Sequence, residues 1–524
     1  MNVGRSLAHE VPAGPFDVIC VGSGFGALSA AALLAKEGGK RVLVLEQHYR
    51  IGGFTHVFTR PGYEWDVGVH YVGQVGPGEL LEPLFTRLTG GALRWARLPD
   101  VVDSIELGTR RFSLRAGKTA FVEELTRAFG GGREALERYV ARIGDVASDW
   151  QRSLMVRAVS ARGVTRTVKD AERTTNEVLR ELGLDEVQRA VVTGNYGDYG
   201  VPPARSSFAM HAAVADHYLG GAWYPVGGAS QLAKTLAGAI EGAGGKLVTS
   251  ARVTRLLVEQ GRVTGVEVEG GHTFRAGVVI SGAGVRNTQR LIPEAHRPAE
   301  WTAKLATVES TPSWLCLYLG FRRSDAELGL TGTNLFIHPD EQLDANVARF
   351  DADPRAPLPV VYVSFPSAKD PDFARRRPGR ATVEVIVPAR WDWFSKWASA
   401  PWQKRGAEYD ELKRSWTTRM LDALFARLPQ LKGQVDHAEL STPLSAAHFS
   451  GHERGELYGL AGTPARFESP FSTATPLEGL LLTGIDTGMP GVGGAAFSGA
   501  LAAAAVLGAR RLLDWLPPPA RGNE

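Results

Sequence analysis

Cysteine is almost absent from this chain. Only Cys20 and Cys316 occur in 524 residues, and two isolated thiols form neither a disulfide framework nor a metal-ligand spacing. We therefore expect no metal site and a reducing, cytoplasmic compartment. The N-terminal residues also lack an apolar run between a basic start and a cleavage site, so no signal peptide is expected.

The chain also has no strong excess of basic or acidic residues. The 59 Lys and Arg residues nearly balance the 56 Asp and Glu residues, and the net charge is only +3. This balance argues against a nucleic-acid partner, which would require a basic surface. Arg375, Arg376 and Arg377 form the one short basic run that stands out, and we interpret it as a solvated loop.

At this length the chain should form two or more domains.

Long uncharged stretches are rare, and one of them could be mistaken for a membrane span. Residues 487–509, TGMPGVGGAAFSGALAAAAVLGA, carry no charge and are long enough to cross a bilayer. They are nevertheless rich in Gly and Ala, contain Pro490, and offer few large apolar side chains to lipid. We predict a buried glycine-rich loop followed by a packed helix, and no transmembrane span.

The N-terminal part contains a pattern typical of dinucleotide binding. FDVICV (16–21) should be a buried strand, GSGFGALSAAALLAKEGG (22–39) a glycine turn and a helix, and RVLVLE (41–46) a second strand. Gly22 and Gly24 permit the tight turn and close approach to a pyrophosphate, while Gly26 and Ala27 keep helix and strand close together. Glu46, at the second strand end, should bind a ribose hydroxyl.

The far end of the chain favours FAD over a nicotinamide cofactor. Asp486 follows a predicted buried strand, and small residues then open a helix, Gly493, Gly494, Ala495 and Ala496 among them. Such a segment can hold a ribityl chain and place a helix N-terminus near the flavin ring. Gly52 and Gly53 add a second close backbone approach. The glycine cluster at 278–288 lacks the acid of a nucleotide site, so we interpret it as a strand returning to the same domain and expect no separate NAD(P) site.

The order of predicted elements indicates an α/β chain with a discontinuous Rossmann-type domain. We assign residues 1–90, 223–290 and 473–515 to the nucleotide-binding domain. Residues 91–222 and 291–472 should form an inserted α+β domain that binds the substrate.

Several stretches resemble a known family. FDVICVGSGFGALSAA, LEQHYRIGGFTHVF and GYEWDVGVHYVG are similar to the carotenoid oxidoreductase group of flavoproteins, which includes phytoene desaturases and carotenoid isomerases. Three stretches in the inserted regions are most similar to its retinol saturase branch: GDYGVPPARSSFAMHAAVADHYLGGAWYPVGGAS (197–230), FPSAKDP (365–371) and KRGAEYDELK (404–413). The resemblance extends from about residue 16 to residue 507.

The resemblance implies a glutathione-reductase-like fold, bound FAD and an apolar polyene substrate such as a retinoid or carotenoid. By motif match, the residues that hold the ADP half are Gly22, Gly24, Glu46, Gln47, His48, Arg50, Gly52 and Gly53. Backbone groups at Val253 would face the adenine, and Asp486 with residues 493–496 would face the flavin. Phe54 stands where the wider superfamily often has Arg, and retinol saturases also lack that Arg.

The implied reaction saturates one carbon–carbon double bond, which needs a hydride from the flavin and a proton from elsewhere. Tyr71 and His70 are the candidate proton donors, and the alternative is that they only brace the flavin loop. Tyr196, Tyr199 and Tyr224 are further candidates. We favour a capped turn around Tyr196, Asp198 and Tyr199, and we expect His211 and His217 to be packed or surface residues.

Three alternatives stay open. The same flavin could isomerise a carotenoid, or desaturate one, and a non-enzymatic lipid-binding escort protein of this fold is a rival that the intact flavin segment disfavours. The electron donor is unknown. The aromatic run RWDWFSKWASAPW (390–402) is best explained by core packing, ahead of a polyene lining or a peripheral membrane contact.

Overall fold

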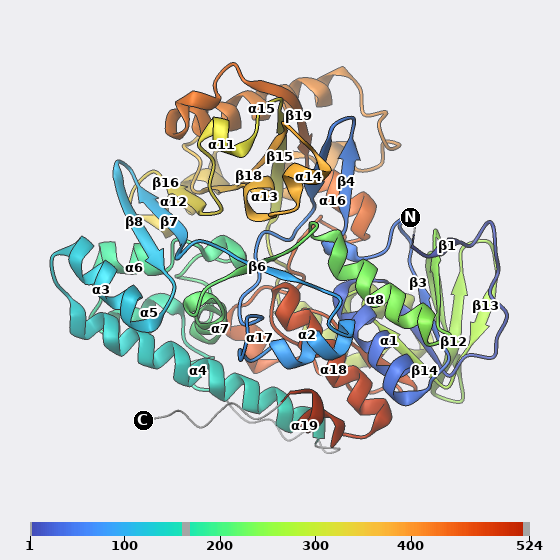
Figure 1. Cartoon of the computed structure of the whole chain (residues 1–524). Coiled ribbons are helices and arrows are strands. Elements are labelled where there is room, and N and C mark those ends of the chain that lie inside the picture. The colour runs from blue at the N-terminus through green and yellow to red at the C-terminus, as the bar shows by residue number, and fades with distance from the viewer. Residues whose placement is uncertain (1–2, 160–167, 517–524) are drawn as a thin grey trace.

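A computed structural model describes residues 3–159 and 168–516 (Figure 1). The chain forms a parallel sheet with helices at one end of the molecule, a larger mixed sheet at the other, and a helical layer beside both.

A six-stranded parallel sheet forms the first layer, and its strand order is β1-β10-β3-β2-β14-β20. Its strands come from segments far apart in the chain: β1 (Arg5–Ser6), β2 (Val18–Val21), β3 (Val42–Leu45), β10 (Lys246–Thr249), β14 (Val278–Ser281) and β20 (Leu480–Leu482). Every residue of β2 and β3 is buried, as expected of apolar parallel strands covered on both faces. β14 pairs with β2, which confirms that the second glycine cluster follows a strand returning to this sheet.

Three helices pack near this sheet: α1 (Phe25–Gly38), α8 (Ser230–Gly242) and α18 (Gly491–Leu507). A separate antiparallel sheet contains β11 (Val253–Glu259), β12 (Arg262–Val268) and β13 (Thr273–Arg275). The Rossmann-type α/β fold that the sequence predicts is therefore confirmed.

A seven-stranded sheet forms the core of the upper part of the molecule in Figure 1, in the order β19-β15-β18-β17-β16-β7-β8. The strands are β7 (Val101–Leu107), β8 (Arg110–Arg115), β15 (Ser313–Phe321), β16 (Asn334–His338), β17 (Val361–Ser364), β18 (Ala381–Ala389) and β19 (Val435–Ser441). Neighbours are antiparallel except β7 and β16. Helices α12 (Leu343–Ala352), α13 (Pro366–Lys369) and α15 (Ala407–Arg427) accompany this sheet.

The helical layer lies to the left in Figure 1 and contains α3 (Lys118–Phe129), α4 (Arg133–Val159), α5 (Thr175–Glu181), α6 (Glu186–Val192) and α7 (Phe208–Leu219). Two short ribbons join the layers, β4 (Val57–Arg60) with β5 (Tyr63–Asp66) and β6 (Trp95–Arg97) with β9 (Trp223–Pro225). Helix α2 (Glu82–Thr89) and helix α9 (Val285–Leu291) complete the elements that border the site.

Small residues explain how the two ends of the chain meet. A Cβ atom on Gly499 of α18 would lie 2.4 Å from the carbonyl oxygen of Gly26 and 2.6 Å from Cβ of Ser29, so α1 and α18 are in backbone contact. The predicted packed helix at 491–507 is thus buried against α1. Among the described residues, no helix is both long and apolar enough to cross a membrane.

The aromatic run serves core packing, as predicted. Trp391, Trp393 and Trp397 pack against the apolar core of the seven-stranded sheet. Trp402 stacks on the His448 ring at 4.4 Å between centroids.

Candidate functional site

The first glycine turn leaves open space at the N-terminus of α1. Gly22 has φ +84°, a conformation that favours glycine, and Gly24 is the residue that precedes the helix. A Cβ on Gly24 would meet nothing within 4 Å. Exposed backbone N–H groups at such a helix start bind phosphate, so the geometry fits a pyrophosphate.

The paired glycines lie directly against this turn. Gly24 and Gly52 form an isolated parallel bridge, and a Cβ on Gly53 would lie 3.0 Å from Cα of Gly24. A Cβ on Gly282 would lie 2.9 Å from Cβ of Ala27, so a larger residue at 27 would push the β14 loop away. The two close approaches predicted at Gly24 and Gly52–Gly53 therefore meet at one place.

Glu46 is held by its own chain at the end of β3. Its Oε2 accepts hydrogen bonds from the Ser23 backbone N–H (2.8 Å) and hydroxyl (2.6 Å), and Oε1 accepts one from the His48 N–H (2.7 Å). The Ser23 hydroxyl oxygen in turn accepts from the Gly52 N–H (2.9 Å). Burial raises the pKa of Glu46. Sequence reasoning missed Ser23, although it lies between the two glycines of the fingerprint.

The side chains that follow Glu46 in the sequence form hydrogen bonds with nearby backbone carbonyls. Gln47 donates to the Phe449 carbonyl (3.2 Å), and the Arg50 guanidinium donates to the Val57 carbonyl (2.7 Å). Burial, with a contribution from the neighbouring His56, lowers the pKa of His48 to about 4, so its ring is neutral at pH 7. Val253, the first residue of β11, is buried and pairs with Val268.

Asp486 joins the flavin segment to two other loops. One carboxylate oxygen accepts from the N–H of Val285, the first residue of α9, and the other from the N–H of Leu460, both at 2.8 Å. The buried Arg466 guanidinium donates to the carbonyls of Leu460 (2.8 Å) and Ile485 (2.5 Å) and thereby shapes this loop. Sequence reasoning did not identify Arg466, which stands in no recognisable motif.

Open space also adjoins the residues that are expected to bind the flavin half of FAD. Built Cβ atoms on Gly484 and Gly491 would meet nothing within 4 Å, whereas those on Gly493 and Gly494 would collide with neighbouring groups. Gly493, Gly494, Ala495 and Ala496 form the first turns of α18 and are packed or buried. Open glycines at the start of α1 and beside Asp486 thus fit the two halves of an FAD molecule.

One histidine connects the flavin segment to the segment at 70–73. A Cβ on Gly493 would lie 3.1 Å from Cε1 of His217, and Nε2 of His217 accepts from the Gly73 N–H at 2.8 Å. His217 and His211 are both packed, as predicted, since the His211 ring accepts and donates between Tyr139 (3.0 Å) and Tyr199 (3.2 Å).

Tyr71 lies between two buried carboxyl groups. Its hydroxyl donates to Asp198 at 2.6 Å and lies 3.4 Å from Asp103. Asn195 and Asn334 also donate to Asp103 (3.3 and 2.9 Å). Burial raises the pKa of Asp198 and the pKa of Tyr71 above their ordinary values, and it raises the pKa of Asp103 to about 6. The turn predicted around Asp198 is present, but its carboxyl contact with Tyr71 was not foreseen.

His70 faces a different set of groups. Its Nδ1 lies 3.1 Å from Oε2 of Glu384, without the alignment that a hydrogen bond needs. The His70 carbonyl accepts from the buried Lys369 ammonium at 3.0 Å. Burial lowers the pKa of His70 to about 3 and that of Lys369 to about 8, and it raises the pKa of Glu384 to about 8. Burial therefore favours the neutral form of the His70 imidazole.

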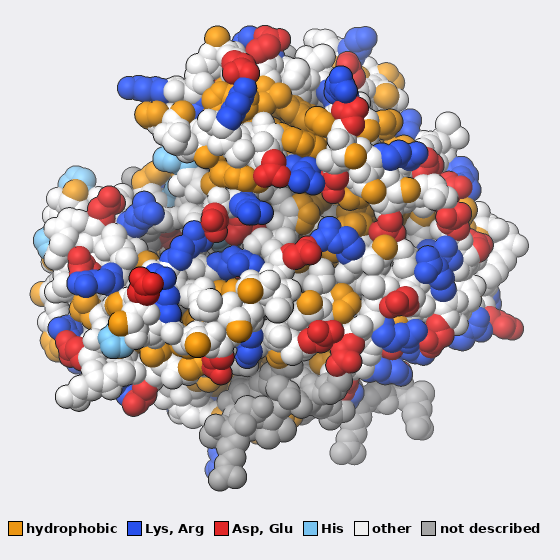
Figure 2. All heavy atoms as spheres, turned by 180° about the vertical axis from the view of Figure 1, so that it is seen from behind, with side chains coloured by type: hydrophobic (Ala, Val, Ile, Leu, Met, Phe, Trp, Pro, Cys, Tyr) orange, Lys and Arg blue, Asp and Glu red, His pale blue; other side chains and the backbone are white. Residues whose placement is uncertain are grey.

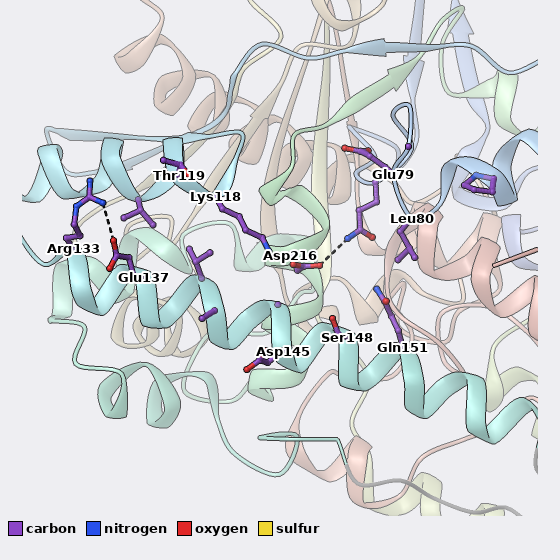
Figure 3. A pocket seen from close by; sticks show the side chains of 17 residues that line it. Glu79, Leu80, Lys118, Thr119, Arg133, Glu137, Asp145, Ser148, Gln151 and Asp216 are labelled. Atoms are coloured by element: carbon purple, nitrogen blue, oxygen red, sulfur yellow. Dashed lines mark hydrogen bonds and ion pairs between the residues drawn. The ribbon is translucent and has the colours of Figure 1, made fainter. Parts of the chain in front are cut away.

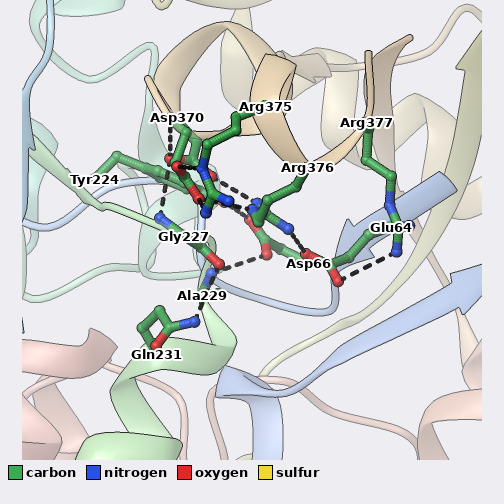
Figure 4. Close-up of polar contacts among 11 residues, drawn as sticks. Glu64, Asp66, Tyr224, Gly227, Ala229, Gln231, Asp370, Arg375, Arg376 and Arg377 are labelled. Atoms are coloured by element: carbon green, nitrogen blue, oxygen red, sulfur yellow. Dashed lines mark hydrogen bonds and ion pairs between the residues drawn. The ribbon is translucent and has the colours of Figure 1, made fainter.

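Beside this segment, Figure 4 shows Asp66 and Tyr224 pointing toward one another. Tyr224 donates its hydroxyl to Asp66, which also accepts from the Ala229 N–H. The expectation of a solvated loop was wrong for Arg376. Its guanidinium is mostly buried and pairs with Glu64 (2.5 Å) and Asp370 (2.6 Å), because the chain brings acids from β5 and α13 against it.

Two pockets are present whose linings contain none of these groups. The larger, about 940 Å³, lies between α3, α4 and the loop before α2, and Figure 3 shows Glu79, Lys118 and Asp216 among the polar side chains on its walls. Gln74 donates to Asp216 at 3.1 Å. The smaller, about 570 Å³, adjoins the seven-stranded sheet and is lined by Tyr196, Trp314, Phe350 and Trp391 among others. The glycines of the first turn line neither pocket.

Comparison with known proteins shows the family to which the chain belongs. Residues 20–88 match the family model of an NAD(P)-binding Rossmann-like domain. The all-trans-retinol 13,14-reductase of Danio rerio is 33% identical, over 97% of this chain and 88% of that protein. The chain belongs to the all-trans-retinol 13,14-reductase family. It is thus related to the wider family of FAD-dependent oxidoreductases that includes phytoene desaturases.

Family membership does not by itself establish one reaction. A protein of Danio rerio named inactive all-trans-retinol 13,14-reductase is 31% identical over 95% of this chain and 87% of its own length. Prolycopene isomerase 1 of an Oncidium hybrid cultivar is 25% identical over 98% and 90%.

Solved structures confirm the fold. A putrescine oxidase bound to putrescine superposes with a TM-score of 0.64 at 17% identity, covering 95% of this chain and all of that chain (100%). Cyclohexylamine oxidase from Brevibacterium oxydans gives a TM-score of 0.59 at 18% identity, with 95% and 100% coverage.

Proposed function

We propose that this protein reduces one carbon–carbon double bond of a retinoid or related polyene, with FAD as its cofactor and Tyr71 as the proton donor. The observation that carries this proposal is the placement of the Tyr71 hydroxyl between Asp198 and Asp103, on a segment that His217 ties to the flavin loop. Relatives over the whole chain length carry the name of such a reductase.

The cofactor site is assigned residue by residue. Gly22, Gly24, Gly52 and Gly53 would hold the pyrophosphate, with Glu46 at the adenosine ribose. The remaining assignments are Gly26 and Ala27 in the turn, Gln47, His48 and Arg50 beside Glu46, Val253 at the adenine, and Asp486 with residues 493–496 at the flavin. FAD, when bound, supplies the hydride chemistry.

Tyr71 is suited to give a proton because it can be reprotonated at once. Its raised pKa keeps the phenol protonated at neutral pH and makes an isolated phenolate costly. The raised pKa of Asp198 favours a protonated carboxyl 2.6 Å from Tyr71 Oη. The Tyr71 hydroxyl would turn from Asp198 toward the substrate, and its O–H bond would break as a carbon–hydrogen bond forms there, while the Asp198 proton passes to the phenol oxygen.

The test is anaerobic incubation of the dithionite-reduced holoprotein with all-trans-retinol, with products analysed by mass spectrometry and absorption. We expect a product two hydrogens heavier with a blue-shifted spectrum. In D₂O, two deuterium atoms should enter the product, one through the proton donor and one through the hydride position of the reduced flavin, because the hydrogen at that position exchanges with solvent. An unchanged mass with altered double-bond geometry would replace reduction by isomerisation, and loss of two hydrogens would indicate desaturation.

Two variants separate Tyr71 from its surroundings. Tyr71→Phe should slow turnover by about 10²-fold while FAD remains bound, as expected for loss of a general acid. Tyr139→Phe is the matched control, because it removes a buried hydroxyl that contacts His211. Equal rates for both variants would refute Tyr71 as the donor.

A colourless protein that releases no flavin on denaturation would revive the lipid-binding alternative.

A peripheral membrane contact remains part of the proposal, because a polyene dissolves in lipid. Figure 2 shows hydrophobic side chains concentrated on the upper half of one face, whereas charges of both signs dominate its lower half. Sedimentation with neutral liposomes tests this contact, and protein that stays wholly in the supernatant would count against it.

A further inference from the structure

A buried ammonium group lies beside Tyr71 and is not used by the proton transfer described above. Lys369, at the end of α13, is 3% exposed. Its Nζ donates to the His70 carbonyl (3.0 Å), to the Ser364 hydroxyl (2.7 Å) and to the amide oxygen of Asn334. It lies 5.5 Å from the centre of the Tyr71 ring. A buried cation is costly unless hydrogen bonds and opposite charges compensate it, so acids near this group are expected to serve it.

Asn334 connects the cation to one of the two acids beside Tyr71. Its amide oxygen accepts from Lys369, and its amide nitrogen donates to Asp103 Oδ1 at 2.9 Å. Oδ2 of Asp103 accepts from Asn195 at 3.3 Å and lies 3.4 Å from the Tyr71 hydroxyl. Both oxygens of Asp103 therefore accept hydrogen bonds, which stabilise its ionised form.

The second acid of this pair, Asp198, has a poorer environment for a negative charge. It accepts from the Tyr71 hydroxyl at 2.6 Å. Burial raises the pKa of both acids, and the charge of Asp103 raises the pKa of Asp198 further. Two amide hydrogen bonds and then the charge of Lys369 lower the pKa of Asp103. Two buried carboxyl groups that flank one hydroxyl ionise one at a time, and this acid pair ionises first at Asp103.

We propose that Lys369 is a positioning residue for the proton donor. Acting through Asn334, it holds Asp103 as a carboxylate. The proton of the acid pair then stays on Asp198, in contact with Tyr71. This inference rests on the proposed function, because it identifies the group that controls the proton supply of Tyr71.

The groups around the acid pair keep one charge state between about pH 6.5 and about pH 7.5. Burial lowers the pKa of His70 to about 3 and that of Lys369 to about 8. It raises the pKa of Glu384 to about 8 and that of Asp66 well above its ordinary value. A change in pH dependence within this range therefore reports on the acid pair. Burial also raises the pKa values of the tyrosines that interact with it, which are Tyr199, Tyr218, Tyr362 and Tyr458.

Asp198→Asn and Asp103→Asn locate the proton, because an amide has the shape of a protonated carboxyl group. The oxidised holoprotein is unfolded in urea at several pH values in this range, without substrate. A carboxyl whose pKa is raised by folding stabilises fully below its unfolded pKa, and this stabilisation is lost as the pH rises toward its folded pKa. Asp198→Asn removes such a group, so the folding constant should fall less steeply, by about tenfold per pH unit. Asp103→Asn should leave the slope unchanged, because Asp103 holds a proton in neither state here.

Lys369→Met tests the cation itself. Without it Asp103 should keep a proton in the folded state, so the folding constant should fall more steeply, by about tenfold per pH unit. The lysine holds its own proton in both states in this range and adds no slope. Adding Asp103→Asn to Lys369→Met should restore the parent slope. Tyr362→Phe is the matched control, because it removes a neutral donor to the same Asn334 oxygen (3.0 Å) and should keep the parent slope.

A merely structural role would lower stability by the same factor at every pH. Parallel slopes for the parent, Lys369→Met and Tyr362→Phe would therefore overturn the inference, as would an exchange of the slopes of Asp103→Asn and Asp198→Asn. If Lys369→Met does not fold, recovery of folding in the double variant with Asp103→Asn would support the inference, and continued failure would count against it.

Product analysis decides the proposed function separately. A reductase without these slopes would remove only this inference. The expected slopes in a holoprotein that does not reduce retinol would keep the electrostatic role of Lys369 and remove only the reductase.

Discussion

Substitution of Gly499 by alanine tests whether the contact between α1 and α18 holds the cofactor site together. The new Cβ would lie 2.4 Å from the Gly26 carbonyl oxygen, 2.6 Å from Ser29 Cβ and 3.0 Å from the Ala30 nitrogen. Backbone atoms cannot rotate away, so the two helices must separate. Overpacking of this kind costs about 3 kcal/mol, at the upper end of its usual range.

A gain in helix propensity opposes that cost, and a matched variant isolates it. Alanine in place of a helical glycine stabilises by about 1 kcal/mol. Gly238 of α8 is exposed, and a Cβ there would meet nothing within 4 Å. Gly238→Ala should therefore gain about 1 kcal/mol, whereas Gly499→Ala should lose about 2 kcal/mol on balance.

Urea unfolding followed by circular dichroism measures both free energies, and flavin release measures the consequence for FAD. Gly24 directly precedes α1 and Gly493 lies in α18, so separation of the helices should weaken FAD binding on the order of tenfold. If Gly499→Ala were as stable as Gly238→Ala and kept its flavin, the inferred backbone contact would be refuted.

Three further predictions concern buried charges. Glu46→Gln should weaken FAD binding by about tenfold or more, measured by released flavin, because the amide repeats only part of the acceptor pattern at Ser23 and the ribose. Arg466→Met removes donors to three carbonyls of the flavin loop and should speed FAD loss on dilution; unchanged loss would contradict that role. Burial raises the pKa of Glu384 from 4.5 to about 8, so the stability from its protonated form is complete below pH 4.5 and lost as the pH rises through about 8. The free energy of unfolding should decline by about 1.4 kcal/mol per pH unit, a few kcal/mol in total. Glu384→Gln should flatten this decline, as measured by urea unfolding from about pH 6 to about pH 9.

The parts of this protein that sequence reasoning found are those whose chemistry is local. The turn at Gly22 and Gly24, with its strand and helix, is specified by neighbouring residues, and the pair Gly52–Gly53 was informative because it follows directly after the predicted ribose-binding acid. The return of β14 to the same sheet followed from its apolar run and from the acid that it lacks.

The buried polar groups could not be found in this way. Lys369 contacts the carbonyl of His70 and Asp198 contacts Tyr71, across separations of 299 and 127 residues. A single lysine in a short helix gives no signal until the fold places acids around it. The same reason explains why Arg376 looked like a solvated residue, although it pairs with Glu64, which lies 312 residues away in the chain.

The segment from β5 to Gly73 fixes the position of Tyr71, the proposed proton donor, relative to the proposed flavin site. The Trp65 indole donates to the Leu319 carbonyl of the seven-stranded sheet at 2.9 Å, and the Asp66 N–H donates to Glu384 at 3.1 Å. At its other end, Gly73 donates to His217, which touches the flavin segment at Gly493. Tyr71 lies between these anchors, so its distance from the flavin depends on both layers. Loosening either anchor should therefore slow the chemical step more than it weakens substrate binding, because alignment of the reacting atoms is what the segment fixes.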